Sequence, residues 1–155
     1  MVKKFFQKDL VTNKKAYFDY EILEKFEAGI TLLGMEVKSL KQNKASIVGA
    51  YVVIKQHEAF LLNATISPYQ PQNASPDYKP QRTRKLLLKN KEINYLSDKT
   101  KQQRLTLIPL KVYNKNGLIK IEIALVKGKK KFDNRETHKK REEKRKIEKA
   151  RKGEY

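Results

Sequence analysis

The feature that most constrains the fold is the abrupt end of the apolar residues near Val126. Before that point, aliphatic and aromatic residues are spread evenly along the chain. A segment with little apolar surface cannot offset the conformational entropy that it loses on folding alone. The sequence therefore predicts a folded body, residues 1–130, and a tail that is disordered when free, residues 131–155. The large apolar residues beyond Val126 are Phe132, Ile147 and Tyr155.

Both parts of the chain are strongly basic. The 155 residues contain 36 Lys and Arg against 17 Asp and Glu, for a formal net charge of +19. Residues 127–155 hold 14 of these basic and 6 of these acidic residues, so this segment carries +8 and residues 1–126 carry the remaining +11. Such a field attracts polyanions, and nucleic acid is the leading partner because each neutralised phosphate releases condensed counterions. On charge alone, a membrane surface or an acidic protein remains open.

Several other classes of protein are disfavoured. The chain has no cysteine, so it forms neither a disulfide framework nor a thiolate site. The first ten residues are charged and lack the apolar run of a secretion signal. No segment approaches the roughly 20 apolar residues of a membrane-spanning helix. We therefore expect a cytoplasmic protein without membrane association.

The body is predicted to be mainly β. Alternating apolar residues indicate a strand over residues 17–22, and the apolar pattern resumes over 30–33 after a break at Ala28-Gly29. Two hairpins follow, the second with Asn-Gly in its connection, which is a strong turn signal. Their strands are residues 51–55 with 59–62, and residues 105–113 with 118–126.

Two helices and one long loop complete the body. Residues 34–42 and 90–103 have apolar residues three apart, and Asn90 is a candidate N-cap for the second helix. Residues 68–84 contain four of the five prolines and are expected to form an exposed loop. About six short strands with two or three flanking helices predict a closed β-barrel of the oligonucleotide-binding type, with an open α+β sheet as the alternative.

The tail has a charge pattern that favours a helix. Acidic residues precede basic ones by four positions, an order that adds a few tenths of a kcal/mol per pair. Such a helix lacks an apolar stripe and is marginal alone, so we expect the tail to become helical against a partner. The pairs are Glu136 with Lys140, Glu142 with Lys146, and Glu148 with Lys152.

The sequence contains no pattern typical of catalysis. The two histidines are His57, in a predicted hairpin turn, and His138, in the tail, and neither has metal-ligand spacing. There is no phosphate-binding loop, dinucleotide-binding glycine pattern or nucleophile elbow. We therefore predict a protein that is not an enzyme and has no catalytic residues, metal or cofactor. An RNA nuclease remains the enzymatic alternative.

Basic clusters and aromatic residues indicate RNA binding. Flexible cations follow a phosphate backbone, and exposed rings stack on unpaired bases. Tyrosines 17, 51, 69, 78 and 113 are candidates for stacking, although strand tyrosines are more often part of a core or its rim. Glu27 is unusual in a cationic protein, and its residue type alone favours a structural hydrogen bond. The basic clusters are Asn13-Lys14-Lys15, Arg82-Thr83-Arg84-Lys85 and Lys127-Gly128-Lys129-Lys130-Lys131.

An ordered series of short motifs resembles one known family. The series begins near Asn13 and ends near Arg135, so it spans the whole body and the start of the tail. The family is that of the SsrA-binding proteins, also called small protein B, which bind tmRNA. The motifs are Asn13-Lys14-Lys15-Ala16, Glu27-Ala28-Gly29-Ile30, Gly34-Met35-Glu36-Val37-Lys38-Ser39-Leu40, Ile66-Ser67-Pro68-Tyr69, Arg82-Thr83-Arg84-Lys85-Leu86-Leu87-Leu88, Ala124-Leu125-Val126-Lys127-Gly128-Lys129-Lys130 and Asp133-Asn134-Arg135-Glu136.

The resemblance implies a function for each part of the chain. The barrel would bind the tRNA-like domain of tmRNA and support its aminoacylation by alanyl-tRNA synthetase. It would deliver tmRNA with elongation factor Tu to stalled ribosomes as a monomer. The resemblance also places Glu27, Asn13, Lys38 and Arg84 on the RNA-facing side. With the basic clusters, the predicted RNA-binding residues are Asn13, Lys14, Lys15, Glu27, Lys38, Arg82, Arg84, Lys85, Lys127, Lys129 and Lys130.

In this family the tail enters the empty mRNA channel of the ribosome and folds there as a helix, close to the decoding centre. The family usually has Asp-Lys-Arg where this chain has Asp133-Asn134-Arg135, so one cation is lost where the tail begins. A structural ribosomal protein with a basic extension is the other non-enzymatic alternative. The predicted ribosome-binding residues are Lys131, Asp133, Asn134, Arg135, Lys139, Lys140, Arg141 and Ile147.

Overall fold

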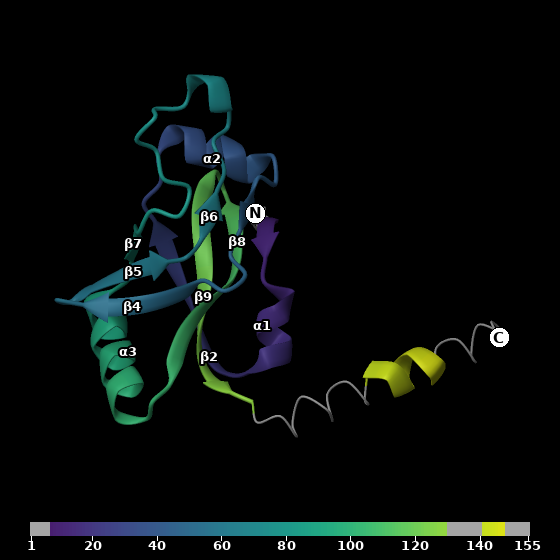
Figure 1. Ribbon diagram of the computed structural model, residues 1–155. Coiled ribbons are helices and arrows are strands. Elements are labelled where there is room, and N and C mark those ends of the chain that lie inside the picture. The colour runs from purple at the N-terminus through teal and green to yellow at the C-terminus, as the bar shows by residue number, and fades with distance from the viewer. Residues whose placement is uncertain (1–6, 130–140, 148–155) are drawn as a thin grey trace, which may run out of the picture.

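The computed structural model describes residues 7–129 and 141–147, and Figure 1 shows their arrangement. Strands dominate, and three helices lie around them. The elements are β1 (Gln7–Thr12), α1 (Lys14–Asp19), β2 (Tyr20–Ile30), α2 (Gly34–Lys41), β3 (Ala45–Ser46), β4 (Tyr51–Lys55), β5 (Glu58–Leu62), β6 (Thr65–Ile66), β7 (Arg84–Leu87), α3 (Asn90–Gln102), β8 (Thr106–Lys115) and β9 (Leu118–Gly128).

Seven strands form one antiparallel sheet in the order β1-β8-β4-β5-β7-β2-β9, and β9 also pairs with β8. The long strand β9 is therefore paired on both sides, with β2 and with β8. The pairing of β4 with β8 is limited to one pair, Val52 opposite Leu107. These pairings confirm a mainly β body with flanking helices. The closed oligonucleotide-binding barrel stays a prediction.

Both predicted hairpins are present, and each has a turn that suits the right-handed twist of its strands. In the β8–β9 turn, Asn116 and Gly117 have φ of 51° and 86°, and the Gly117 N–H donates to Asn114 Oδ1 (2.9 Å). In the β4–β5 turn, Gln56 and His57 have φ of 52° and 65°. Two consecutive residues with positive φ characterise the tightest hairpin connections.

The two sides of β9 pack against different parts of the molecule. Ile119, Ile121, Ile123 and Leu125 face the main core, which Leu40 of α2 and Leu96 of α3 also enter. On the other side, Ala124 and Val126 pack beneath α1, with Ala16, Ile108 and Leu110. Farther toward the hairpin turn this outer side becomes polar, at Lys120 and Glu122. The outer surface of β2, β9 and β8 is thus covered by α1 at one end and open at the other.

Three local predictions were wrong. Residues 17–19 belong to α1 rather than to a strand, because the Asn13 side chain accepts a hydrogen bond from the N–H of Ala16 (3.3 Å) and starts a helix. Strand β2 is not broken at Ala28-Gly29. Gly29 lies between Leu87 of β7 and Lys120 of β9, and a Cβ there would lie 3.2 Å from that of Leu87, so the glycine permits close strand approach.

The third wrong prediction concerns the start of α3. Asn90 is its first residue rather than its cap, and Glu92 accepts a hydrogen bond from the N–H of Lys89 (3.3 Å). The long loop between β6 and β7 is present as predicted, with one short 3-10 turn at Pro71–Asn73. No helix in the described part of the chain is long and apolar enough to span a membrane.

Candidate nucleic-acid interface

The start of α1 is fixed by Asn13, which is 4% exposed. Besides capping the helix, its side-chain amide donates to the carbonyl oxygen of Pro109 on β8 (3.0 Å). The polar atoms of Asn13 are therefore used inside the protein, and RNA contact through this residue stays a prediction. Its two neighbours, Lys14 and Lys15, are exposed on α1. Asn13 thus positions a helix whose first turn presents two cations.

The end of β9 is joined to the same helix. The N–H of Lys129 donates to the carbonyl oxygen of Asp19 (3.1 Å), and its ammonium to that of Tyr17 (3.3 Å). The basic cluster before α1 and the basic cluster at the end of β9 are far apart in the chain, and this contact brings them to one end of the molecule. We call this group the α1 corner. It consists of Lys14, Lys15, Lys127 and Lys129.

Part of the tail is described. Residues 141–147 are helical, and all of their side chains are exposed, including Ile147. The guanidinium of Arg141 lies 5.7 Å from the centre of the Phe18 ring of α1. The remaining predicted tail and boundary residues lie outside the described part of the chain. They are Lys130, Lys131, Asp133, Asn134, Arg135, Lys139 and Lys140.

At the open end of the β2-β9-β8 surface, three strands place a carboxylate among polar partners. Glu27 of β2 accepts a hydrogen bond from the hydroxyl of Tyr113 on β8, and the Lys115 ammonium lies 3.2 Å from the same oxygen. The side chains of Glu27 and Lys115 remain 40% and 37% exposed. The carboxylate is therefore held in one place while it stays accessible to solvent.

The electrostatics of this group favour a charged Glu27. The hydrogen bond from Tyr113 lowers the pKa of the Glu27 carboxyl, and Lys115 and Lys120 lower it further, against a smaller effect of burial. Burial raises the pKa of the Tyr113 hydroxyl, and its bond to Glu27 raises it further. Tyr113 thus stays a hydrogen-bond donor, and Glu27 an acceptor, throughout the physiological range.

Cations surround this carboxylate on the outer surface. Glu27 lies opposite Glu122, which lies opposite Lys111. The Lys111 ammonium is 5.3 Å from the centre of the Tyr113 ring, and the Lys25 ammonium is 3.8 Å from Glu122. We call this surface the Glu27 face. It consists of Lys25, Glu27, Lys111, Tyr113, Lys115, Lys120 and Glu122.

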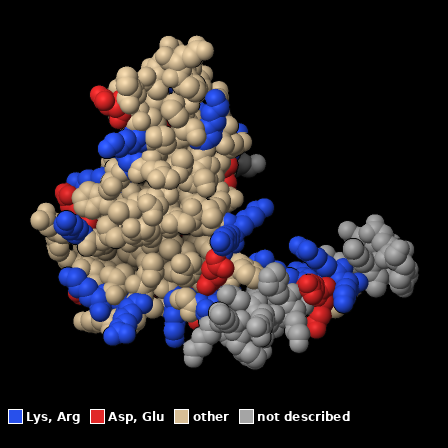
Figure 2. Space-filling view, viewed as in Figure 1, with Lys and Arg blue, Asp and Glu red and all other residues tan. Residues whose placement is uncertain are grey.

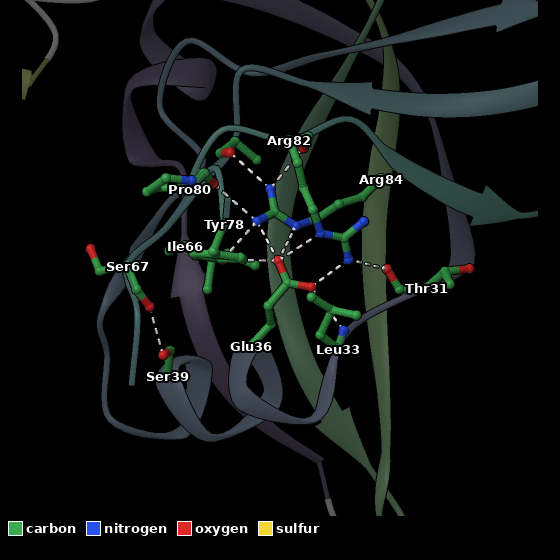
Figure 3. Close-up of polar contacts among 11 residues, drawn as sticks. Thr31, Leu33, Glu36, Ser39, Ile66, Ser67, Tyr78, Pro80, Arg82 and Arg84 are labelled. Atoms are coloured by element: carbon green, nitrogen blue, oxygen red, sulfur yellow. Dashed lines mark hydrogen bonds and ion pairs between the residues drawn. The ribbon is translucent and has the colours of Figure 1, made fainter. Parts of the chain in front are cut away.

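A second carboxylate, Glu36 of α2, is completely buried in a network of donors (Figure 3). One oxygen accepts from the N–H of Leu33 (2.8 Å) and from Arg82. The other accepts from Nε of Arg84 (2.8 Å), Nε of Arg82 (3.1 Å) and the hydroxyl of Tyr78 (3.1 Å). Burial raises the pKa of the Glu36 carboxyl, but these bonds outweigh it and the pKa lies below its usual value.

Arg84 connects this network to the backbone. Its guanidinium donates to the carbonyl oxygens of Ala64, Arg82 and Pro80, each at 3.0 Å, and the residue is 0% exposed. Arg84 therefore has a structural role in this network, and RNA contact through it stays a prediction. An arginine in a basic cluster is usually solvated, but here the buried charge of Glu36 binds it.

The other predicted residues of this region lie at the surface. Arg82 is half-buried, with a guanidinium nitrogen 3.4 Å from the carbonyl oxygen of Thr31. Lys85 is exposed and paired with Glu58 (2.9 Å). Lys38 is exposed on α2 with its ammonium 5.6 Å from the centre of the Tyr69 ring. Arg82 and Lys85 thus already have acidic partners, whereas Lys38 faces an aromatic ring.

No group of three His, Asp or Glu side chains within residues 7–129 and 141–147 is arranged to hold a metal. His57 lies exposed in the β4–β5 turn, as its sequence position predicts. The absence of metal, cofactor and catalysis stays a prediction.

In Figure 2, Lys and Arg lie in separate groups around the edge of one face, whose middle is uncharged.

The sequence did not indicate two components of these sites. Glu36 is missed because its i,i+4 neighbours are ordinary helix residues, and its arginine partners lie 46 and 48 positions away. Lys115 was assigned only to a hairpin turn. Its outward alternation with Tyr113 and Lys111 on β8 is a period-two signal that would have found it.

Comparison with known proteins gives concordant matches. The model of the SmpB protein family matches residues 10–153. The SsrA-binding protein of Sulfurihydrogenibium sp. (strain YO3AOP1) is 51% identical over 95% of this chain and 96% of its own length. That of Thermosipho africanus (strain TCF52B) is 52% identical, over 90% and 94%. A chain of the solved structure "tmRNA-SmpB: a journey to the center of the bacterial ribosome" has 42% identity and a TM-score of 0.65, covering 77% of this chain and 84% of that one.

Proposed function

The chain belongs to the SmpB protein family, and from this membership we propose that it binds tmRNA and acts in trans-translation on the ribosome. The family is one of RNA-binding proteins. The role proposed here is to recognise the tRNA-like domain of tmRNA, support its aminoacylation by alanyl-tRNA synthetase and deliver it to stalled ribosomes with elongation factor Tu. We propose that the protein does so in the cytoplasm, as a monomer of the oligonucleotide-binding barrel type and without catalysis of its own.

The observation that best supports RNA binding is the Glu27 face. A carboxylate near RNA repels phosphate, but one that stays exposed to solvent can accept a hydrogen bond from a base amino group or a ribose hydroxyl. Tyr113 and Lys115 orient Glu27 for such a contact. Lys120 is proposed to neutralise a nearby phosphate, and so are Lys25 and Lys111, which would exchange their long ion pairs with Glu122 (3.8 Å) and Asp9 (3.7 Å) for RNA. The lysines position the RNA, and Glu27 selects it.

The α1 corner is proposed to contact a different part of the ribosomal complex. Strand β2 separates Glu27 from Tyr20 by seven residues, or about 23 Å at the rise of a strand. The tail leaves the body beside Tyr20, because Gly128 is paired with it. RNA on the Glu27 face therefore leaves the α1 corner and the tail free to follow another strand, and we propose that the tail enters the empty mRNA channel near the decoding centre.

The division of labour is testable by truncation. Ending the chain after Lys131 removes the tail but leaves every contact of the Glu27 face, so tmRNA affinity should change by less than about threefold. Tagging of peptides on stalled ribosomes in a reconstituted translation system should be abolished. Equal loss of both activities would contradict two separable RNA targets. The matched control is the full-length Glu27→Gln variant, which keeps the tail and should lose tmRNA affinity.

The departure at Asn134 gives a narrower test. If the usual Lys at this position contacts a phosphate, Asn134→Lys should increase tagging at a limiting protein concentration, with tmRNA affinity of the body unchanged. Thr137→Lys is the matched control, because it adds the same unit of charge elsewhere in the tail. Equal gains in the two variants would mean that only the total charge of the tail matters.

A further inference from the structure

A hollow of about 350 Å³ lies between α2 and the long loop that follows β6. It is lined on one side by Met35 and Lys38 of α2 and on the other by Tyr69, Gln70 and Asn73 of the loop. Its size is at the lower end of small-ligand sites, which are about 300–1,000 Å³. Its lining joins an aromatic ring, a thioether and polar side chains.

Two cations share the Tyr69 ring. The ammonium groups of Lys38 and Lys44 lie 5.6 and 6.0 Å from the ring centre, and Lys44 also donates to the carbonyl oxygen of Tyr69 (3.4 Å). Within the described residues, neither lysine has a carboxylate within 4.0 Å. The Tyr69 wall of the hollow therefore has two positive charges beside it, Lys38 in the lining and Lys44 next to the ring, that no carboxylate of the described residues neutralises.

The loop that forms one wall of this hollow is held at both of its ends. Ser39 of α2 donates to the carbonyl oxygen of Ser67 (2.7 Å), just before Tyr69. On the returning segment, Tyr78 donates to the carbonyl oxygen of Ile66 (2.7 Å) and Arg84 to that of Pro80 (3.0 Å). Figure 3 shows the Tyr78 and Arg84 contacts beside Glu36 and the Ser39–Ser67 contact apart from them. This wall is therefore ordered before a ligand binds, so binding does not have to offset a loss of loop conformational entropy.

We propose that this hollow is a subsite for one unpaired nucleotide, with its base against Tyr69 and Met35 and its phosphate between Lys38 and Lys44. Two uncompensated ammonium groups attract a phosphate, and an aromatic ring with an adjacent thioether accepts the face of any base. The choice of RNA as the ligand of this subsite rests on the proposed function. The subsite adds a contact with a single-stranded segment to the recognition by the Glu27 face.

The absence of tryptophan in the chain provides a direct probe. Tyr69→Trp introduces one fluorophore into the full-length protein, and Tyr95→Trp on α3 is the matched control, because the Lys99 ammonium lies 5.6 Å from that ring. Each variant is titrated with a single-stranded ten-nucleotide oligouridylate and with an abasic ribose-phosphate chain of equal length. We expect the oligouridylate, and not the abasic chain, to quench the fluorescence of the Tyr69→Trp variant, and neither to quench that of Tyr95→Trp.

The two lysines are tested in the same background. Lys38→Gln with Lys44→Gln should reduce the salt dependence of oligouridylate binding by about 0.7 in the log–log slope, the value for the one single-strand phosphate that is no longer neutralised. Equal quenching by the abasic chain would overturn the subsite, as would displacement of the oligouridylate by an equal charge concentration of polyglutamate. Either result would mean that binding at the hollow depends on the charge of the ligand and not on its bases.

A second readout does not depend on the tryptophan variants. Tyr69→Ala, with its fold checked by circular dichroism, should bind the oligouridylate about 5- to 150-fold more weakly, as expected when one base no longer stacks, while Tyr95→Ala binds as before. Unchanged affinity of Tyr69→Ala would overturn the subsite. In parallel, failure of the unaltered protein to bind tmRNA would overturn the proposed function, whereas tmRNA binding without quenching of the Tyr69→Trp variant would overturn the subsite alone.

Discussion

Two glutamates of this protein have lowered pKa values for different reasons and, we propose, different purposes. Glu36 is fully buried, and two arginines, a tyrosine and a backbone N–H donate to its two oxygens. Glu27 has one tyrosine and one lysine as partners, and its side chain stays 40% exposed. One carboxylate therefore has its hydrogen-bonding capacity filled, and the other has capacity left for a ligand.

The difference shows how partners rather than residue type determine the role of a charge. Around Glu36, removal of a partner leaves a charge without water, which is costly. Around Glu27, water replaces any partner that is removed, so the cost to stability is small. Stability measurements should therefore respond to Glu36 and its arginines, and RNA-binding measurements to Glu27.

The largest effect is expected for Arg84→Met. It should lower the free energy of unfolding by about 3–5 kcal/mol, because it removes the main buried counter-charge of Glu36 and three hydrogen bonds to backbone carbonyl oxygens, two of them in the loop between β6 and β7. Urea denaturation followed by circular dichroism measures this loss. Lys115→Met, which removes the cation beside Glu27, should cost less than about 1 kcal/mol. Similar losses of unfolding free energy in the two variants would contradict the proposed difference between Glu36 and Glu27.

The next effect is expected in RNA binding. Glu27→Gln should weaken tmRNA binding by about 10- to 150-fold, which corresponds to one hydrogen bond to a charged group at about 1.5–3 kcal/mol. Its free energy of unfolding should stay within about 1 kcal/mol of that of the unaltered protein. Filter binding at constant salt measures the affinity. Tighter binding by this variant would mean that Glu27 only repels phosphate, which would contradict the proposed hydrogen bond to RNA.

The pH dependence of stability gives a third, smaller difference. Both folded-state pKa values lie below that of an unfolded glutamate, about 4.3, so each carboxylate stabilises the protein above that pH. This contribution is lost as the pH falls through the folded-state value. Between pH 5 and pH 3, stability should therefore fall less steeply for Glu36→Gln than for the unaltered protein. Glu27→Gln should change the slope less, since solvent screens that group. Urea midpoints across this range that fall in parallel for all three proteins would contradict the proposed difference.

The smallest effect is expected at the α1 corner. Lys14→Gln and Lys15→Gln should each weaken ribosome binding slightly and reduce its salt dependence, because each exposed lysine makes at most one phosphate contact. Lys55→Gln, at the exposed end of β4, is the matched control and should leave the slope unchanged. Equal changes in all three variants would mean that binding responds to net charge rather than to this corner.

The sequence predicted the parts of the fold that depend on local signals. The Asn116-Gly117 turn and the alternation of Ile119 to Leu125 identified the β8–β9 hairpin, because both signals act over a few residues. The strand assigned to residues 17–19 was wrong, because one capping side chain, Asn13, outweighs the alternation there. The continuity of β2 through Gly29 depends on Leu87, which no local pattern indicates.

The candidate sites were less predictable for the same reason. Lys14, Lys15 and Lys127 are exposed on the surface, as runs of cations usually are. Arg84 belongs to a similar run, but it is buried because Glu36 lies 48 residues earlier and folds against it. A charge run thus indicates a basic surface without saying which of its members is a structural partner. That distinction requires the three-dimensional pairing of strands and helices.

The most direct test of the central claim is to sequence the RNA that copurifies with the full-length protein and with its Glu27→Gln and Glu36→Gln variants at equal recovery of folded protein. We predict that one tRNA-like RNA dominates the sample from the unaltered protein. It should be depleted at least about tenfold with Glu27→Gln, as one hydrogen bond to a charged group implies, and retained by the folded fraction of Glu36→Gln. Ribosomal RNA alone in all three samples would contradict tmRNA recognition through Glu27 and favour a structural ribosomal protein.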